Sequence, residues 1–222
     1  MAVLGVDGWR GAWVGARLDG RTVELLALPD AAAVLAVPDV EVVGIDMPIG
    51  LSDDGARACD RSAKGCLGRA GSSVFPAPVR AVLAAHDYAE ARVLSVHATG
   101  GTSLSAQAWQ LVRSIRSLDD ALGDPPADHV VEVHPELAFR HGLGGVSDPK
   151  VTARGLAQRL AALRTVMDVD AALLAAPPRV PAVDALDACA AAWSARRITD
   201  GTAECVGDGA TDARDRPMRI CW

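Results

Sequence analysis

Two tight turns within the first 28 residues constrain the fold more than any other feature of the sequence. Apolar runs, partly β-branched, cover residues 2–7, 12–18 and 22–28. Residues 8–11 (GWRG) join the first two runs, and Asp19-Gly20 joins the second to the third. Because Asp-Gly between apolar runs is a strong hairpin signal, we expect an antiparallel meander of three strands.

A fourth apolar run, residues 41–46, follows a short helical pattern between Pro29 and Pro38. A strand reached through a helical crossover should lie parallel to the first strand and beside it. We therefore predict an α/β fold whose mixed central sheet has three antiparallel strands, then parallel strands, and is flanked by helices. Further patterns predict helices at 88–97, 105–122, 152–166 and 182–198, and strands at 129–134 and 219–222.

The segment 47–79 is rich in Gly, Pro, Ser and Arg and lacks apolar periodicity. Long irregular segments within compact domains are more often functional than accidental. Asp124-Pro125-Pro126 is expected to end the helix that begins near residue 105. With 222 residues, 50% of them hydrophobic, we expect one domain, 1–222, with an irregular and helical insertion around 47–125.

The formal net charge of −6 argues against an avid, nonspecific nucleic-acid-binding protein. Charge is uneven along the chain, however. Between residues 57 and 80, one acidic residue, Asp60, accompanies five basic ones: Arg57, Arg61, Lys64, Arg69 and Arg80. This stretch predicts either a local basic surface or a solvated arginine-rich loop.

Five cysteines, an odd number without a Cys-x-x-Cys pair, favour a reducing compartment and argue against a structural zinc site. The first residues lack the basic start and long apolar stretch of a signal peptide. No apolar run reaches membrane-spanning length. We therefore expect a cytoplasmic protein without a membrane partner.

Carboxylates end two of the predicted strands. Asp7 ends the first strand and Asp46 ends the strand expected beside it. The carboxyl ends of neighbouring parallel strands meet at the usual ligand crevice of an α/β sheet. Two carboxylates there repel one another unless a cation or a proton holds them together. Alone, each aspartate is equally explained as a turn residue.

Two further carboxylates, Asp184 and Asp187, are three residues apart in a helical segment of small and apolar residues. They share one helix face, and small neighbours let a helix approach a sheet closely. The alternative is that Asp184 is an N-cap and Asp187 the N3 residue, both favoured by the helix dipole.

Carboxylate oxygens of this kind suit Mg²⁺ or Mn²⁺. Two such ions about 4 Å apart can activate water and stabilise the leaving oxygen of a phosphodiester. Glu132 is a further candidate ligand and Glu136 a further member of the site. His134 is either a general acid/base or substrate contact, or, more simply, a structural histidine.

Several short motifs, in their order along the chain, resemble the DUF429 family, often described as predicted ribonuclease H-like nucleases. They are residues 5–11 (GVDGWRG), 44–51 (GIDMPIGL), 72–75 (SSVF), 99–100 (TG), 104–107 (LSAQ), 132–136 (EVHPE) and the helix 184–193. The resemblance implies a mixed sheet whose first three strands are antiparallel. It spans nearly the whole chain.

The final helix also resembles that of RuvC-type resolvases, where two aspartates three residues apart complete an acidic quartet. This resemblance implies that Asp7, Asp46, Asp184 and Asp187 fill the four places. Many family members begin this helix with paired aspartates, whereas Val183 precedes Asp184 here. The ligand set implied by the resemblance is therefore open.

The leading hypothesis is a metal-dependent nuclease or phosphodiesterase that uses two-metal-ion catalysis on these four aspartates. Nucleic acid or a small phosphodiester would be the substrate, and a homodimer would lengthen the binding groove. The expected substrate contacts are Arg10, Arg57, Arg61, Arg69, His134 and Glu136. The alternatives are a non-enzymatic nucleic-acid or protein binding module with a structural acidic cluster and, less favoured without a Gly-x-x-x-x-Gly-Lys-Ser/Thr loop, a nucleotide phosphohydrolase.

Overall fold

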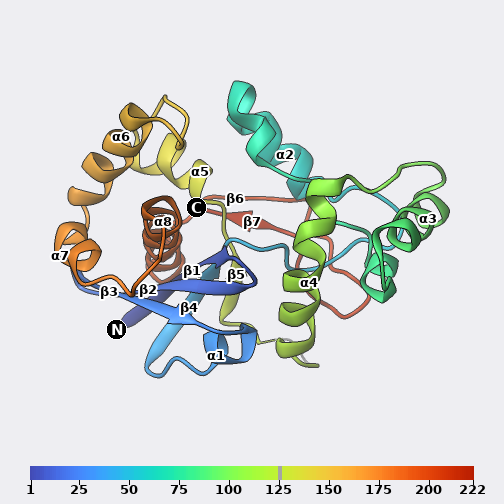
Figure 1. Cartoon of the computed structure of the whole chain (residues 1–222), viewed down its shortest axis with the longest axis horizontal. Coiled ribbons are helices and arrows are strands. Elements are labelled where there is room, and N and C mark those ends of the chain that lie inside the picture. Colours follow the sequence, from blue (N-terminus) through green and yellow to red (C-terminus); the bar gives the residue numbers. More distant parts are fainter. Residues whose placement is uncertain (125–126) are drawn as a thin grey trace. The chain divides into compact units, whose positions relative to one another are not determined.

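The computed structural model describes residues 1–124 and 127–222, and its internal contacts divide the chain into two units (Figure 1). Unit 1 comprises Met1–Met47, Asp128–Cys205 and Cys221–Trp222. Unit 2 comprises Pro48–Ala127 and Val206–Ile220, and so includes the segment where we expected an insertion. Pro125 and Pro126, the expected helix breakers, lie outside the described residues.

Unit 1 is built on a five-stranded sheet with the order β3-β2-β1-β4-β5. Its strands are β1 (Ala2–Trp9), β2 (Ala12–Asp19), β3 (Thr22–Leu28), β4 (Val40–Ile45) and β5 (Val130–Glu132). The first three are antiparallel, and β4 and β5 run parallel to β1. The predicted mixed α/β class is therefore confirmed, including the hairpin at Asp19-Gly20, where Gly20 has a φ of 57°.

Helix α8 (Ala182–Thr199) packs against β1, β2 and β4 and is buried over most of its surface. Two glycines permit this close approach. A Cβ atom on Gly5 would lie 1.9 Å from the backbone nitrogen of Ala192, and one on Gly44 would lie 2.8 Å from the backbone oxygen of Ala191. Small residues on both elements therefore bring the helix backbone next to the strands.

The other helices of unit 1 lie around this sheet and α8. They are α1 (Ala31–Leu35), α5 (Pro135–Leu137), the π-helical η3 (Ala138–Leu143), α6 (Ala153–Arg164) and α7 (Val169–Leu174). Helix α1 packs on β2 and β3, whereas α5, α6 and α7 contact α8. The sequence patterns did not predict α5, η3 or α7, which are short.

Unit 2 contains α2 (Ala58–Leu67), α3 (Tyr88–Thr99) and α4 (Ala106–Ala121), with 3₁₀ helices η1 (Gly68–Ser73) and η2 (Arg80–Ala84). The expectation of an irregular segment at 47–79 is wrong where α2 forms. Its buried positions are Cys59, Asp60, Ala63 and Leu67. Only one of these is a large aliphatic residue, so the helix has little apolar periodicity.

Buried ion pairs hold the last segment of unit 2 to the rest of that unit. Arg216 is fully buried and donates to the carboxylate of Asp119, while Arg80 and Arg214 also pair with Asp119. Arg80 pairs with Asp212 as well, and Asp212 accepts from the backbone nitrogen of Leu51 at 3.0 Å. The segment 206–220 is thus an integral part of unit 2.

A disulfide joins Cys205 to Cys221 on a two-stranded sheet of β6 (Cys205–Val206) and β7 (Ile220–Cys221). Glu204 and Trp222 exchange backbone hydrogen bonds beside it, at 3.0 and 2.9 Å. The other three cysteines are thiols. The odd cysteine count did not indicate this pair. In the part of the chain that the structure describes, helices long and apolar enough to cross a membrane are absent.

Candidate functional site

Asp7 and Asp46 lie side by side on neighbouring parallel strands. Val6 of β1 is in register with Ile45 of β4, and the backbone nitrogen of Asp46 donates to the carbonyl oxygen of Val6 at 2.8 Å. Strand side chains alternate between faces. Asp7 therefore shares a face with Gly5, and Asp46 shares one with Gly44; this is the face that α8 covers.

Helix α8 presents its own two aspartates on this face. Asp187 is only 2% exposed, and Asp184 is partly buried. The helix begins after Pro181, which is its N-cap. The alternative that Asp184 is the N-cap is therefore wrong, although its place in the first turn still lets the helix dipole stabilise it. The structure thus brings the four predicted aspartates into one region of unit 1.

The pKa values show that the aspartates affect one another. Burial, then the charges of Asp46 and Asp187, raises the pKa of Asp7 well above its usual value. Burial also raises the pKa of Asp46 to about 7, against the lowering effect of Lys150. The pKa of Asp187 is raised by burial too, and Lys150 again opposes the shift. Such a set of buried and partly buried carboxylates is stabilised by protons or by a cation.

Lys150 provides a cation within the protein itself, and the sequence patterns did not predict it. Its Nζ atom donates to Oδ2 of Asp187 at 2.6 Å, across 37 positions of the sequence. Burial works to lower the pKa of Lys150, but the charges of Asp187, Asp46 and Asp7 outweigh it and raise the pKa. The ammonium group is therefore charged and lies among the carboxylates.

Helix α6 fixes the segment that carries Lys150. Gln158 accepts from the backbone nitrogens of Ser147 and Asp148 at 3.1 and 2.9 Å. A Cβ atom on Gly155 would lie 2.0 Å from the carbonyl oxygen of Pro149, so the segment rests directly on the helix backbone. Lys150 therefore projects from a well-anchored position.

Arg159 of α6 lies beneath this segment and is 1% exposed. It donates to the carbonyl oxygen of Asp148 at 3.0 Å and to Oε2 of Glu136 at 2.5 Å. Arg140 donates to Oε1 of Glu136 at 2.6 Å. Burial works to raise the pKa of Glu136, but these two arginines outweigh it and hold the pKa low. Glu136 is thus bound by two arginines of unit 1.

The remaining predicted residues of unit 1 lie in different surroundings. Glu132 is in register with Ile45, so its buried side chain lies on the sheet face opposite α8. His134 is the N-cap of α5, where its Nδ1 accepts from the backbone nitrogen of Leu137 at 3.4 Å. Arg10 is exposed in the turn after Asp7; burial raises the pKa of Asp184, and the charges of Lys150 and then Arg10 oppose this shift. Arg10 thus acts on one of the four aspartates.

The three predicted arginines of unit 2 differ in exposure. Arg57 is 2% exposed; it pairs with Asp60 at 2.5 Å and donates to the backbone oxygens of Ile49 and Gly50. Arg61 and Arg69 are exposed. Arg57 therefore has a structural role within unit 2, whereas Arg61 and Arg69 are open to solvent.

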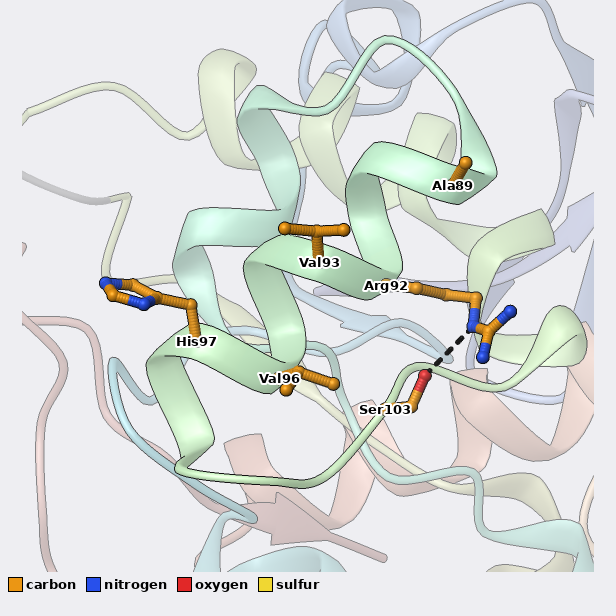
Figure 2. A pocket seen from close by; sticks show the side chains of 6 residues that line it. All are labelled: Ala89, Arg92, Val93, Val96, His97 and Ser103. Carbon is orange, nitrogen blue, oxygen red and sulfur yellow. Dashed lines mark hydrogen bonds between the residues drawn. The ribbon is translucent and has the colours of Figure 1, made fainter.

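A hollow of about 600 Å³ lies elsewhere, in unit 2, along α3. Figure 2 shows its lining side chains: Ala89, Arg92, Val93, Val96, His97 and Ser103. Arg92 donates to the hydroxyl of Ser103 at 3.1 Å and closes one side. The lining has no carboxylate, so this hollow does not contain the predicted site.

Among the described residues, no group of three or more His, Cys, Asp or Glu side chains is arranged to hold one metal ion. Lys150 binds the most buried of the aspartates instead. The donor set still suits a divalent ion in another way. Mg²⁺ is often bound by only one or two carboxylates and keeps several waters. Asp7 and Asp46, on adjacent strands, are two such carboxylates.

The fold and this site define a mixed α/β protein with a carboxylate–lysine cluster where the sheet meets its central helix. A family model described as "Protein of unknown function (DUF429)" matches residues 5–212. The chain belongs to the DUF429 family. No curated protein and no solved structure matched the chain.

The raised pKa values predict that the metal-free protein loses stability as the pH rises from about 4 to about 7. The pKa of Asp46 is 3.8 in the unfolded chain and about 7 in the folded one. An acid with a raised folded pKa binds its proton more tightly when folded. The stabilising contribution of the Asp46 carboxyl to the free energy of unfolding is complete below the unfolded pKa and is lost as the pH rises through the folded pKa.

Urea unfolding in the presence of a chelator, at several pH values across this range, measures the effect. Asp46→Asn removes the titrating group, so the free energy of unfolding of this variant should depend less on pH. Equal pH dependence in the parent and in Asp46→Asn would contradict the assignment.

Proposed function

We propose that the protein is a metal-dependent hydrolase of phosphodiesters, either a nuclease or a phosphodiesterase. The observation that carries the proposal is the pair Asp7 and Asp46 on adjacent parallel strands, facing Asp187 of α8. A partly buried pair of carboxylates of this kind is unfavourable when ionised unless a cation lies beside it. Functional sites are where such groups are most often found together.

Mg²⁺ or Mn²⁺ is the proposed cofactor, because all the donors are carboxylate oxygens. When bound, such an ion supplies positive charge that polarises a phosphoryl oxygen and lowers the pKa of a water molecule. Asp7 and Asp46 would bind the ion. The backbone nitrogen of Gly8 donates to Oδ1 of Asp7 at 2.8 Å and so helps to fix the orientation of this carboxylate.

The protein's own cations would bind the phosphate oxygens. Lys150 is charged, and 47% of its side chain is exposed to solvent. Arg10 lies in the turn directly after the strand that carries Asp7. The exposed Arg61 and Arg69 are proposed contacts to a longer substrate. Nucleic acid as partner, a homodimer and a cytoplasmic location belong to the same proposal.

One observation favours a second candidate function. Lys150 already neutralises Asp187 at 2.6 Å, as in a purely structural ion pair. In that case the cluster stabilises unit 1, and the protein is a non-enzymatic binding module for nucleic acid or protein. Binding of divalent ions distinguishes the two functions, because a structural lysine–aspartate pair has no need of them.

The test combines calorimetry of Mg²⁺ and Mn²⁺ binding with hydrolysis assays on DNA, RNA and a small phosphodiester. We expect the parent to bind the ion and to cleave one of these substrates. Asp7→Asn should weaken binding and lower the rate by about 100-fold or more, since it removes a charged ligand at the reacting centre. Asp187→Asn should also lower the rate.

Asp39→Asn is the matched control, because Asp39 is exposed and precedes β4, whereas Asp46 follows it. Its φ of 56° is one that asparagine readily adopts, so the control should fold and behave like the parent. If the parent binds neither ion, even with an oligonucleotide present, the hydrolase proposal fails and the binding module becomes the better account.

A further inference from the structure

We propose that Lys150 takes the place of the second metal ion, so that the site holds one divalent ion, at Asp7 and Asp46. This inference rests on the proposed function and changes its chemistry from two ions to one. It follows from the position of the ammonium group, the charge of the cluster and the anchoring of the lysine.

The position of Lys150 is the first argument. A two-ion site needs carboxylates from both sides of the cluster, and Asp187 is its most buried member, at 2% exposed. Oδ2 of Asp187 accepts from Nζ of Lys150 at 2.6 Å. The ammonium group therefore already lies where α8 would provide a ligand to a second ion. Asp7 and Asp46 remain as an adjacent pair on the strands.

The charge of the cluster is the second argument. When ionised, Asp7, Asp46, Asp184 and Asp187 carry four negative charges. Lys150 pairs with Asp187 at 2.6 Å and Arg10 lies in the turn after Asp7, so these two side chains place two positive charges beside the cluster. The remaining two negative charges match one divalent ion. A second divalent ion would leave two uncompensated positive charges at a partly buried site.

Anchoring of the lysine is the third argument. Arg159, Gln158 and Gly155 hold residues 147–149 against α6 through hydrogen bonds and direct backbone contact. The buried Arg159 is itself matched by Glu136, at 2.5 Å, and so adds no net charge. A residue projected from so well fixed a segment is preorganised for the position that it occupies.

Asp7 and Asp46 are the two side-chain ligands that the proposed single ion would have. The described residues contain no group of three or more side chains arranged around one metal position. A site of two carboxylates completed by waters and substrate oxygens is usual for Mg²⁺. The competing possibility is that ions displace Lys150, whose side chain is 47% exposed, and that two ions then bind.

The experiment counts the ions bound by the full-length chain. Mn²⁺ is titrated by calorimetry, and the bound ion is observed by electron paramagnetic resonance. We expect one Mn²⁺ per chain in the parent, with the resolved spectrum of an isolated ion. Lys150→Met removes the charge but keeps a long side chain, and it should bind two ions. Two Mn²⁺ ions about 4 Å apart couple magnetically, so the resolved spectrum should be replaced by a coupled one.

Two controls accompany this comparison. The sequence has two lysines, and Lys64→Met removes the other, exposed one; this variant should bind one ion like the parent. Lys150→Arg keeps the positive charge and should also bind one. If Lys150→Met does not fold, judged by circular dichroism, the ion count of the parent and of Lys150→Arg still decides.

Two ions in the parent would overturn the single-ion inference and leave the proposed function standing. One ion in a folded Lys150→Met would also overturn it, because the lysine would then not be what excludes the second. Absence of binding in every variant would overturn the proposed function and this inference together.

Discussion

Replacing Gly5 by alanine is expected to prevent stable folding of unit 1. The new Cβ atom would lie 1.9 Å from the backbone nitrogen of Ala192 and 2.2 Å from the backbone oxygen of Ala188. Backbone atoms cannot rotate away, so α8 would have to move off the sheet. We expect a loss of more than about 4 kcal/mol, which is a large part of the stability of a typical domain.

Thermal unfolding followed by circular dichroism, together with the yield of soluble protein, measures this loss. Gly65→Ala is the matched control, because, apart from its chain neighbours and the nearby backbone of its own helix, no heavy atom of the described residues lies within 4 Å of the added Cβ. Gly65 is in α2, where alanine favours the helix by up to about 1 kcal/mol. A Gly5→Ala variant as stable as the parent would show that α8 does not pack so closely on β1.

Arg159→Met should have the second largest effect, a loss of about 3 kcal/mol in the free energy of unfolding. The substitution removes hydrogen bonds to Glu136 and to the backbone oxygens of Asp148 and Gly155. It also removes the guanidinium that lies 5.2 Å from the ring centre of Phe139. Arg140 still pairs with Glu136, so we expect the lower end of the range for broken buried ion pairs.

Two measurements separate this effect from a general loss of stability. Urea unfolding gives the free energy, and hydrogen exchange should become faster at the backbone amides of Ser147 and Asp148. Arg154→Met provides the control on the same helix. The side chain of Arg154 is 82% exposed, and its Nη2 lies 3.7 Å from Oδ2 of Asp148. Its removal should therefore change the free energy of unfolding by about 0.5 kcal/mol or less. Equal effects of the two substitutions would contradict the anchoring role of Arg159.

The sheet could be predicted because its signals are local. Asp19-Gly20 fixes a hairpin, and the helix before residues 41–46 makes that strand parallel to β1. Asp7 and Asp46 follow directly from this, since each comes at the carboxyl end of a buried apolar run. The i, i+3 spacing of Asp184 and Asp187 likewise predicted a shared face of α8.

Lys150 and Arg159 could not be predicted in the same way, because their partners are distant in the sequence. Lys150 meets Asp187 across 37 positions, and Arg159 meets Glu136 across 23. One signal was present in α6. Gly155, Arg159, Ala162 and Leu163 form its buried stripe, so a charged residue occupies the apolar face of the helix. Such a residue usually has a buried partner.

The predicted substrate contacts were the least determined by sequence. A run of basic residues shows charge but not exposure, and Arg57 proves to be buried against Asp60 whereas Arg61 and Arg69 are exposed. For Glu132, only the register with Ile45 reveals the sheet face on which its side chain lies. The burial of Arg57 depends on how unit 2 packs, and the sheet face of Glu132 depends on how the strands pair. Single runs of residues specify neither.

The chain passes between its two units three times before returning to unit 1 at Cys221, so neither unit is one continuous stretch of sequence. A fragment that ended at Ala127 would keep Arg80 and Asp119 but lack Asp212 and Arg216, their buried partners. Such a fragment should therefore not fold as unit 2 does. Conversely, a protease cut within residues 206–220 would leave both pieces covalently joined, because the Cys205–Cys221 disulfide spans the cut.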